Sequence, residues 1–192
     1  MDQGRLKRVW LRIALWSLPV ALAAVAFPGL IPDYHTVVDR SMPGTLRTIA
    51  TAQEDFRRKD LDEDGIRQFW REDIAGLYTL MPKRNPTVLP LRLIELSTAA
   101  ADERCRSDIE RYAVKAAKAG YWYRAIRHRD EKPLSPDRFA VVCFPEVYSK
   151  QLTLTYVLDE RGIIYRSDLG HGHGLEIFPT EDELRLKWSK LD

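Results

Sequence analysis

An apolar run without a charged residue extends from Ile13 to Ile31, near the start of the chain. Its length matches the roughly 20 residues that a helix needs to cross the ~30 Å hydrocarbon core of a bilayer. Four basic residues lie between positions 5 and 12, just before the run. By the positive-inside rule, residues 1–12 are therefore expected to be a cytoplasmic tail, residues 13–32 a transmembrane helix and residues 33–192 an exported domain.

The same run also fits a secretory signal peptide. Ala24 and Ala26 form the small-x-small pattern that a signal peptidase cleaves, after a basic start and an apolar stretch. The two interpretations differ in whether the anchor is retained, and both export the remainder. We predict a retained, single-pass anchor in the inner (cell) membrane, in contact with lipid, with the C-terminal domain periplasmic or extracellular.

The composition argues against binding to nucleic acid. The chain has 192 residues, and its 30 Lys and Arg nearly balance its 28 Asp and Glu, for a formal net charge of +2. The basic residues are spread along the chain among acidic neighbours, as in "RRKDLDEDG" and "RHRDEK", which is typical of a solvated surface. The exported part is long enough for one domain and one core.

Two cysteines, Cys105 and Cys143, are the only ones in the chain. In an oxidising compartment an even pair first suggests a disulfide, which would stabilise the fold by about 3 to 5 kcal/mol in the chain-entropy model. The alternative is that Cys143, within the apolar "FAVVCF", is a small buried hydrophobe. We predict the disulfide.

The exported part combines helical and strand patterns. Apolar residues at spacings of three and four, from Leu46 to Phe56, predict an amphipathic helix over residues 43–58. Shorter helices are expected over residues 91–101, 107–118 and near the C-terminus. Strands are expected from Tyr121, in "RFAVVCFP", and in "TLTYVLDERGIIYRSDLG" with a turn at Asp159–Gly162. We therefore predict an α+β fold in which the 43–58 helix covers the apolar face of an antiparallel sheet.

An acidic loop follows the predicted helix. "KDLDEDGIRQFW" places aspartates at alternate positions before a glycine, which is how an EF-hand loop begins. The twelfth position holds Arg71, and a guanidinium cannot bind calcium, so a true EF-hand is excluded. A looser calcium site remains, with these predicted ligands: Asp60, Asp62, Asp64, the carbonyl of Ile66, and Asp73.

The alternative for this loop is structural. Short acidic residues with a glycine also cap a helix and form a turn. Phe69 and Trp70 would then pack back on the helix and make the loop a corner of the scaffold.

Residues that carry enzymatic chemistry are not found in recognisable patterns. The chain contains no nucleophile elbow, phosphate-binding loop, dinucleotide fingerprint or zinc-protease motif. His171 and His173 form "GHGHG" without an identifiable third ligand, which favours a turn over a metal site. We expect no enzyme and no small-molecule substrate.

The order of these segments resembles the type IV pilins and the pseudopilins of type II secretion. The resemblance rests on an apolar segment followed by "GTLRTIATAQEDF", a loop, and a meander ending in "VLDERGIIYRSD". It departs from the family at the processing site, where Gly4 is followed by Arg5 and no glutamate precedes the apolar run. The resemblance implies a transmembrane helix that leads into an amphipathic helix packed on an antiparallel sheet.

Two functions follow as hypotheses. The resemblance implies a membrane-anchored structural or interaction protein, a subunit or accessory of a type II secretion or type IV pilus-type assembly. Its partners would be other pilin-like subunits or proteins of the secretion apparatus. The acidic loop suggests instead an exported calcium-dependent binding or sensor module.

Overall fold

The computed structural model describes residues 34–81, 89–130 and 135–191. The chain divides into two compact units, residues 1–37 and 38–192, and the following description concerns the second. The predicted tail and transmembrane segment, residues 1–12 and 13–32, lie outside the described residues. Within the described residues, no helix is both long enough and apolar enough to cross a membrane.

Helix α2, Tyr34–Lys59, forms the cover of the core. Leu46 and Ile49 are completely buried, and Met42 and Phe56 nearly so. Their spacing puts these side chains on one face of the helix, whereas Thr48 and Thr51 are exposed on the other. The predicted helix over residues 43–58 is confirmed, and it begins earlier, continuing through Pro43.

The five strands form one antiparallel sheet in which each strand pairs with the next along the chain. The turn between the third and fourth strands is the predicted one. Its Gly162 has φ +73°, and Asp159 Oδ1 accepts the N–H groups of Arg161 and Ile163 at 3.0 Å each. The strands are β1 Tyr121–Ile126, β2 Ala140–Pro145, β3 Leu154–Asp159, β4 Ile164–Asp168 and β5 Ser189–Leu191.

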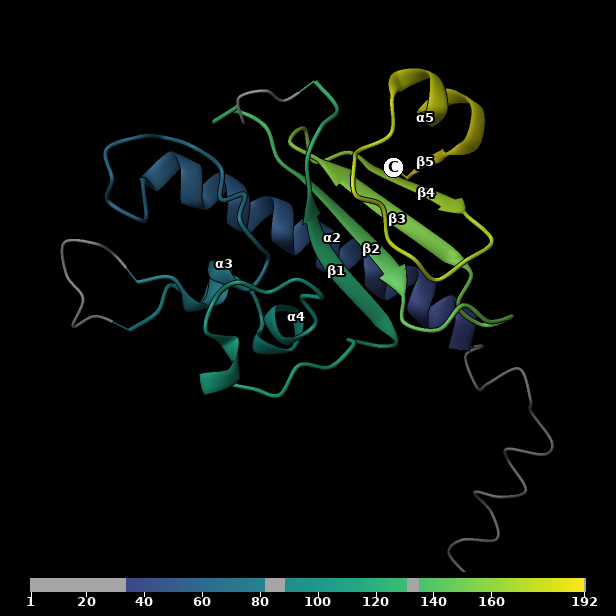
Figure 1. The fold of residues 1–192 in the computed structure, drawn as a ribbon, viewed down its shortest axis with the longest axis horizontal. Coiled ribbons are helices and arrows are strands. Elements are labelled where there is room, and N and C mark those ends of the chain that lie inside the picture. Colours follow the sequence, from purple (N-terminus) through teal and green to yellow (C-terminus); the bar gives the residue numbers. More distant parts are fainter. Residues whose placement is uncertain (1–33, 82–88, 131–134, 192) are drawn as a thin grey trace, which may run out of the picture. The chain divides into compact units, whose positions relative to one another are not determined.

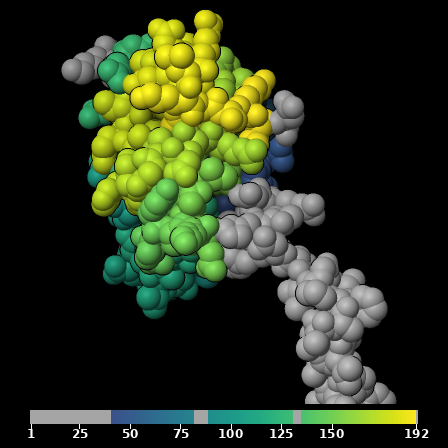
Figure 2. Space-filling view, turned by 90° about the vertical axis from the view of Figure 1, so that its right-hand side faces the viewer, coloured from purple at the N-terminus to yellow at the C-terminus, as the bar shows by residue number. Residues whose placement is uncertain are grey.

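Both faces of the sheet are covered, as Figure 1 shows for α2 on one side and α5 (Glu181–Lys187) on the other. Tyr123 and Tyr156 belong to the same buried cluster as the apolar residues of α2. A second cluster on the opposite face joins Val142 and Val157 to Leu184 of α5. Figure 2 shows the later strands and the C-terminal residues, coloured green to yellow, gathered on one face. The predicted α+β arrangement of a helix on an antiparallel sheet is confirmed.

The segment between α2 and β1 is mostly irregular. Its described residues include α3 (Gly76–Thr79), α4 (Leu96–Ala100) and the 3-10 turn η2 (Ile109–Arg111). The predicted helix over residues 107–118 is wrong. Only the 3-10 turn forms within it, and the backbone N–H of Ala116 donates to the carbonyl of Ala100 in another segment. The predicted helix over residues 91–101 is shorter than expected.

Candidate functional site

The acidic loop brings its three aspartates together. Asp60, Asp62 and Asp64 each contribute a carboxylate oxygen to a group whose members lie within 4.8 Å of one another. The chain folds sharply here: Asp60 has φ +48° and Gly65 has φ +87°, a backbone conformation that glycine adopts without strain. Ile66 donates its N–H to Asp64 Oδ1 at 2.7 Å, which keeps it in the same loop.

Asp60 has one carboxylate oxygen that accepts a hydrogen bond in this loop and one that does not. Asp60 Oδ2 accepts the N–H of Gly65 at 3.0 Å, but Asp60 Oδ1 is buried and accepts no hydrogen bond from the described residues. Three carboxylates at such short separation repel one another, and a cation would remove that repulsion. Oxygen ligands of this kind suit a hard cation such as Ca²⁺.

Asp73 does not belong to this group, so its assignment as a calcium ligand is corrected. Its carboxylate is 2% exposed and accepts five hydrogen bonds. Five donors occupy the lone pairs that a metal would need. Oδ1 accepts from the Trp70 indole and the Gly76 N–H, and Oδ2 accepts from the N–H groups of Arg106 and Ser107 and the Ser107 hydroxyl.

Asp102 lies beside Asp73 at a buried corner. Its Oδ2 accepts the N–H groups of Ile74 and Ala75 at 2.6 and 2.9 Å, and its Oδ1 accepts that of Arg104 at 3.0 Å. Burial, together with the nearby charge of Asp73, raises the pKa of Asp102 to about 6 even though these hydrogen bonds lower it. The two carboxylates tie the loop after α2 to the segment that precedes β1.

The two cysteines are free, so the predicted disulfide is corrected. Cys143 is completely buried in β2 and lies opposite Tyr123 of β1, which in turn bridges to Asp102 on its far side. Cys105 is therefore on the far side of β1 from Cys143. A separation of two strand spacings is about 10 Å, and a disulfide can join Cα atoms that are at most ~7 Å apart.

The acidic loop ends in the predicted corner. The rings of Phe56 and Trp70 meet edge to face, with centroids 5.9 Å apart. Gln53 on α2 exchanges two hydrogen bonds with the backbone of Trp70: its amide donates to the carbonyl at 2.6 Å, and its oxygen accepts the N–H at 2.9 Å. The packing of Phe69 and Trp70 back on the helix is confirmed.

His171 and His173 are exposed and lie close to each other, with ring centroids 5.6 Å apart. The N–H of His173 donates to Nδ1 of His171 at 3.2 Å. Within the described part of the chain, neither histidine belongs to a cluster of three metal-binding side chains.

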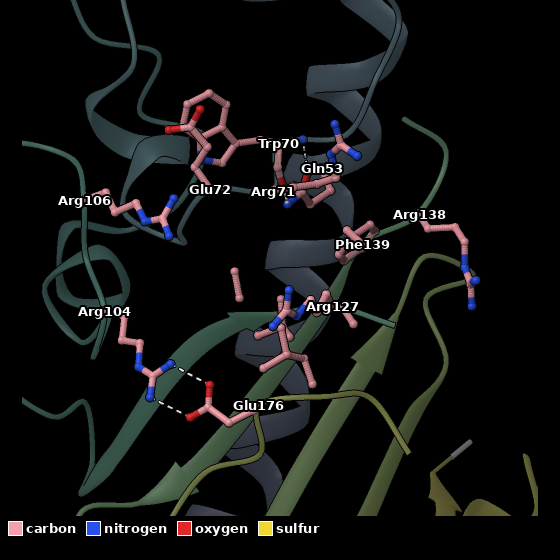
Figure 3. Close-up of a pocket in the computed structure, with 14 residues that line it drawn as sticks. Gln53, Trp70, Arg71, Glu72, Arg104, Arg106, Arg127, Arg138, Phe139 and Glu176 are labelled. Carbon is pink, nitrogen blue, oxygen red and sulfur yellow. Dashed lines mark hydrogen bonds and ion pairs between the residues drawn. The ribbon is translucent and has the colours of Figure 1, made fainter. Parts of the chain in front are cut away.

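A cavity of about 370 Å³ lies between the corner and the outer edge of β1 (Figure 3). The sequence did not predict this cavity, because its arginines lie far apart in the chain. Each arginine occurs in a segment that is typical of solvated surface. Only two glutamates, Glu72 and Glu176, balance the arginines of the lining, and apolar residues of β1 and β2 complete it. The arginines are Arg71, Arg104, Arg106, Arg127 and Arg138.

Two of these groups show how the cavity binds a carboxylate. Both terminal nitrogens of Arg104 donate to the two oxygens of Glu176 at 2.5 Å, drawn as dashed lines in Figure 3. Arg124 adds a third bond to the same carboxylate at 2.8 Å. The hydrogen bond from Arg104 lowers the pKa of Glu176.

No protein-family model, curated protein or solved structure matches this chain in comparisons of sequence and of structure.

Proposed function

We propose that this chain is a membrane-anchored, pilin-like structural or interaction protein. It would serve as a subunit or accessory of a type II secretion or type IV pilus-type assembly. Residues 13–32 would hold it in the membrane, and the α+β domain would be displayed outside the cytoplasm.

One observation carries the proposal: the helix that follows the apolar run is also the helix that covers the sheet. α2 begins at Tyr34, two positions after residue 32, and from Met42 to Phe56 one of its faces is buried in the core. A helix used in this way would connect a membrane segment to the folded domain. That order of elements, with an antiparallel meander after the helix, is what supports a pilin-like assembly protein.

The test starts with the fate of the N-terminus. The full chain should sediment with membranes, resist extraction by salt, and retain a mature N-terminus at or near Met1. A matched variant in which a cleavable signal peptide replaces residues 1–32 should appear as a released, soluble domain. A mature wild-type chain that begins after Ala26 would remove the anchor and contradict the proposal.

Association in the membrane tests the assembly itself. A cysteine introduced at Leu18 should cross-link neighbouring copies, or cross-link the chain to another pilin-like protein, because transmembrane helices of such assemblies pack together. A cysteine at the exposed Arg185 of α5 is the control and should not cross-link. Absence of any cross-link at Leu18 and at other positions of the segment would argue for an isolated anchor.

A second candidate function is calcium binding by the acidic loop. The observation that favours it is the buried Oδ1 of Asp60, which accepts no hydrogen bond from the described residues and belongs to a group of three aspartates. Ligand saturation at about 100 times Kd stabilises a fold by about 2.7 kcal/mol. For a domain of this size, that free energy raises the melting temperature by several degrees.

The melting temperature with calcium and with a chelator therefore tests this second function. We expect calcium to raise the melting temperature of the wild type and to have no effect on Asp60→Asn. Asp108→Asn, an exposed aspartate outside the loop, is the matched control and should respond like the wild type. Equal melting temperatures of the wild type with calcium and with chelator would exclude a calcium-steadied loop.

A further inference from the structure

The outer edge of β1 is the starting point, because β1 is the first strand of the sheet and β2 is its neighbour among the described strands. In an antiparallel pair, successive residues direct their backbone groups alternately toward the partner strand and away from it. Tyr121 lies opposite Pro145, which has no N–H, and therefore belongs to the set that points away. The alternation places Tyr123, Ala125 and Arg127 in the same outward set.

Other segments cover most of this edge. The N–H of Tyr123 donates to the carbonyl of Ala101 at 2.9 Å, and its carbonyl accepts the N–H of Glu103 at 2.8 Å. Lys118 and Tyr121 bond to each other in both directions at 2.9 and 3.0 Å. Beyond the end of the strand, the carbonyl of Arg127 accepts the N–H of Phe178 at 2.9 Å.

Ala125 is the gap in this cover. No hydrogen bond joins its outward N–H and C=O to any described residue outside the sheet. The same residue lines the arginine-rich cavity, together with its neighbours Ile126 and Arg127. One strand position with an unused donor and an unused acceptor therefore opens into a positively charged cavity.

Two arginines around the gap, Arg106 and Arg127, form no ion pair with the described residues, whereas Arg104 and Arg138 are paired with carboxylates. Arg71 bonds to the carbonyl of Ser135. Figure 3 shows Arg106 and Arg127 at the same opening, from different segments of the chain. The Arg104–Glu176 pair shows that a carboxylate is bound well in this environment.

We propose that this cavity binds a short extended stretch of an acidic peptide. One carbonyl of the peptide would accept the N–H of Ala125, and one of its N–H groups would donate to the Ala125 carbonyl, as in strand addition to a sheet edge. Acidic side chains beside that point would bind Arg106 and Arg127. A small anion lacks the paired N–H and C=O of a peptide backbone, so it would bind the arginines without forming both hydrogen bonds to Ala125. The proposal does not depend on membrane anchoring or on assembly.

The experiment measures binding of labelled peptides to the full chain in detergent micelles. The probe is a short peptide of alternating glutamate and valine. The first control is the same peptide with lysine in place of glutamate, and the second is the glutamate peptide N-methylated at its central residues. We expect the glutamate peptide to bind, the lysine peptide not to bind, and N-methylation to weaken binding about tenfold, since it removes the backbone donors.

Variants of the protein test the arginines. Arg106→Ala and Arg127→Ala should each weaken binding of the glutamate peptide about tenfold, as loss of a charge-assisted hydrogen bond predicts. Arg67→Ala removes an exposed arginine outside the cavity and should leave binding unchanged. The melting temperature of each variant is compared with that of the wild type, and Arg106→Lys replaces any variant that unfolds.

A measurement on the wild type keeps the test independent of variants. In a chain with ¹⁵N-labelled alanine, the glutamate peptide should shift the amide resonance of Ala125 and leave that of the exposed Ala116 in place. No peptide binding at millimolar concentration would overturn the proposal. Equal binding of the N-methylated peptide, with full competition by citrate, would also overturn it and assign the cavity to small anions.

Discussion

Asp73 and Asp102 bring carboxylate oxygens within 4.8 Å of each other at a buried corner, although 28 residues separate them from one another in the chain. Each accepts several hydrogen bonds, two of them from backbone N–H groups that lie near the other aspartate in the chain. Asp73 accepts the N–H groups of Arg106 and Ser107, and Asp102 accepts those of Ile74 and Ala75. The pair therefore helps to hold the loop after α2 against the segment that precedes β1.

The first prediction concerns pH. The folded pKa of Asp102 is about 6, above the ordinary value of 3.8, so the folded state binds a proton that the unfolded state releases. The stability that this group contributes is complete below pH 3.8 and is lost as pH rises through 6. We expect Asp102→Asn, which cannot ionise, to gain on the wild type by at most about 3 kcal/mol between pH 4 and pH 7.

Urea unfolding at several pH values, on both chains in parallel, measures this difference. Carboxylates with lowered pKa, such as Glu176, contribute the opposite trend to both chains and cancel in the comparison. A constant difference between the variant and the wild type across this range would contradict the raised pKa.

The second prediction concerns Asp73. Asp73→Ala leaves five buried or half-buried donors without an acceptor, and we expect a loss of about 3 to 5 kcal/mol in the free energy of unfolding. Asp108→Ala, at an exposed position in the same segment, should change it by less than about 0.5 kcal/mol. Equal effects of the two substitutions in urea unfolding would show that the corner does not contribute to stability.

The third prediction concerns the thiols. Burial raises the pKa of both Cys105 and Cys143, and Cys143 is completely buried. A thiol reagent should therefore modify Cys143 in the native protein only at the rate of unfolding, and Cys105 faster, because its side chain is partly exposed. In denaturant without reductant both should react. A denatured chain in which neither thiol reacts would show that the disulfide forms after all.

The fourth prediction concerns the core face of α2. Leu46→Ala and Ile49→Ala each create a cavity under the sheet and should cost about 2 to 5 kcal/mol. Thr48→Ala, on the exposed face of the same helix, should be close to neutral. Thermal unfolding by circular dichroism distinguishes the two classes, and a uniform response along the helix would mean that α2 does not cover the core.

The parts of the fold that were predicted correctly are those with a recognisable local pattern in the sequence. Leu46, Ile49 and Phe56 repeat at the period of a helix, and "DERG" has the composition of a tight turn between two strands. The C-terminal helix was also expected, and it buries Leu184 against the sheet. The short β5, with only three residues, has no such signal and was missed.

The parts that were missed depend on contacts between distant segments. Alanines and lysines over residues 107–118 favour a helix locally, but Ala116 and Lys118 donate their N–H groups to Ala100 and Tyr121 in other segments, which an α-helix would not allow. The even number of cysteines suggested a disulfide, but β1 lies between the two cysteines. The five arginines of the cavity come together only because the loop after α2, the segment before β1 and the start of β2 meet at one edge.

The order of elements along the chain also affects synthesis and export. The apolar face of α2 leaves the ribosome, or a translocation channel, well before β1, β2 and β3, which supply much of the core that covers it. Because the strands then add one after another, that face stays open to water until β3 has emerged. A chaperone that binds amphipathic helices would therefore stay bound longest at residues 42–56. Slower translation between positions 60 and 120 should increase aggregation.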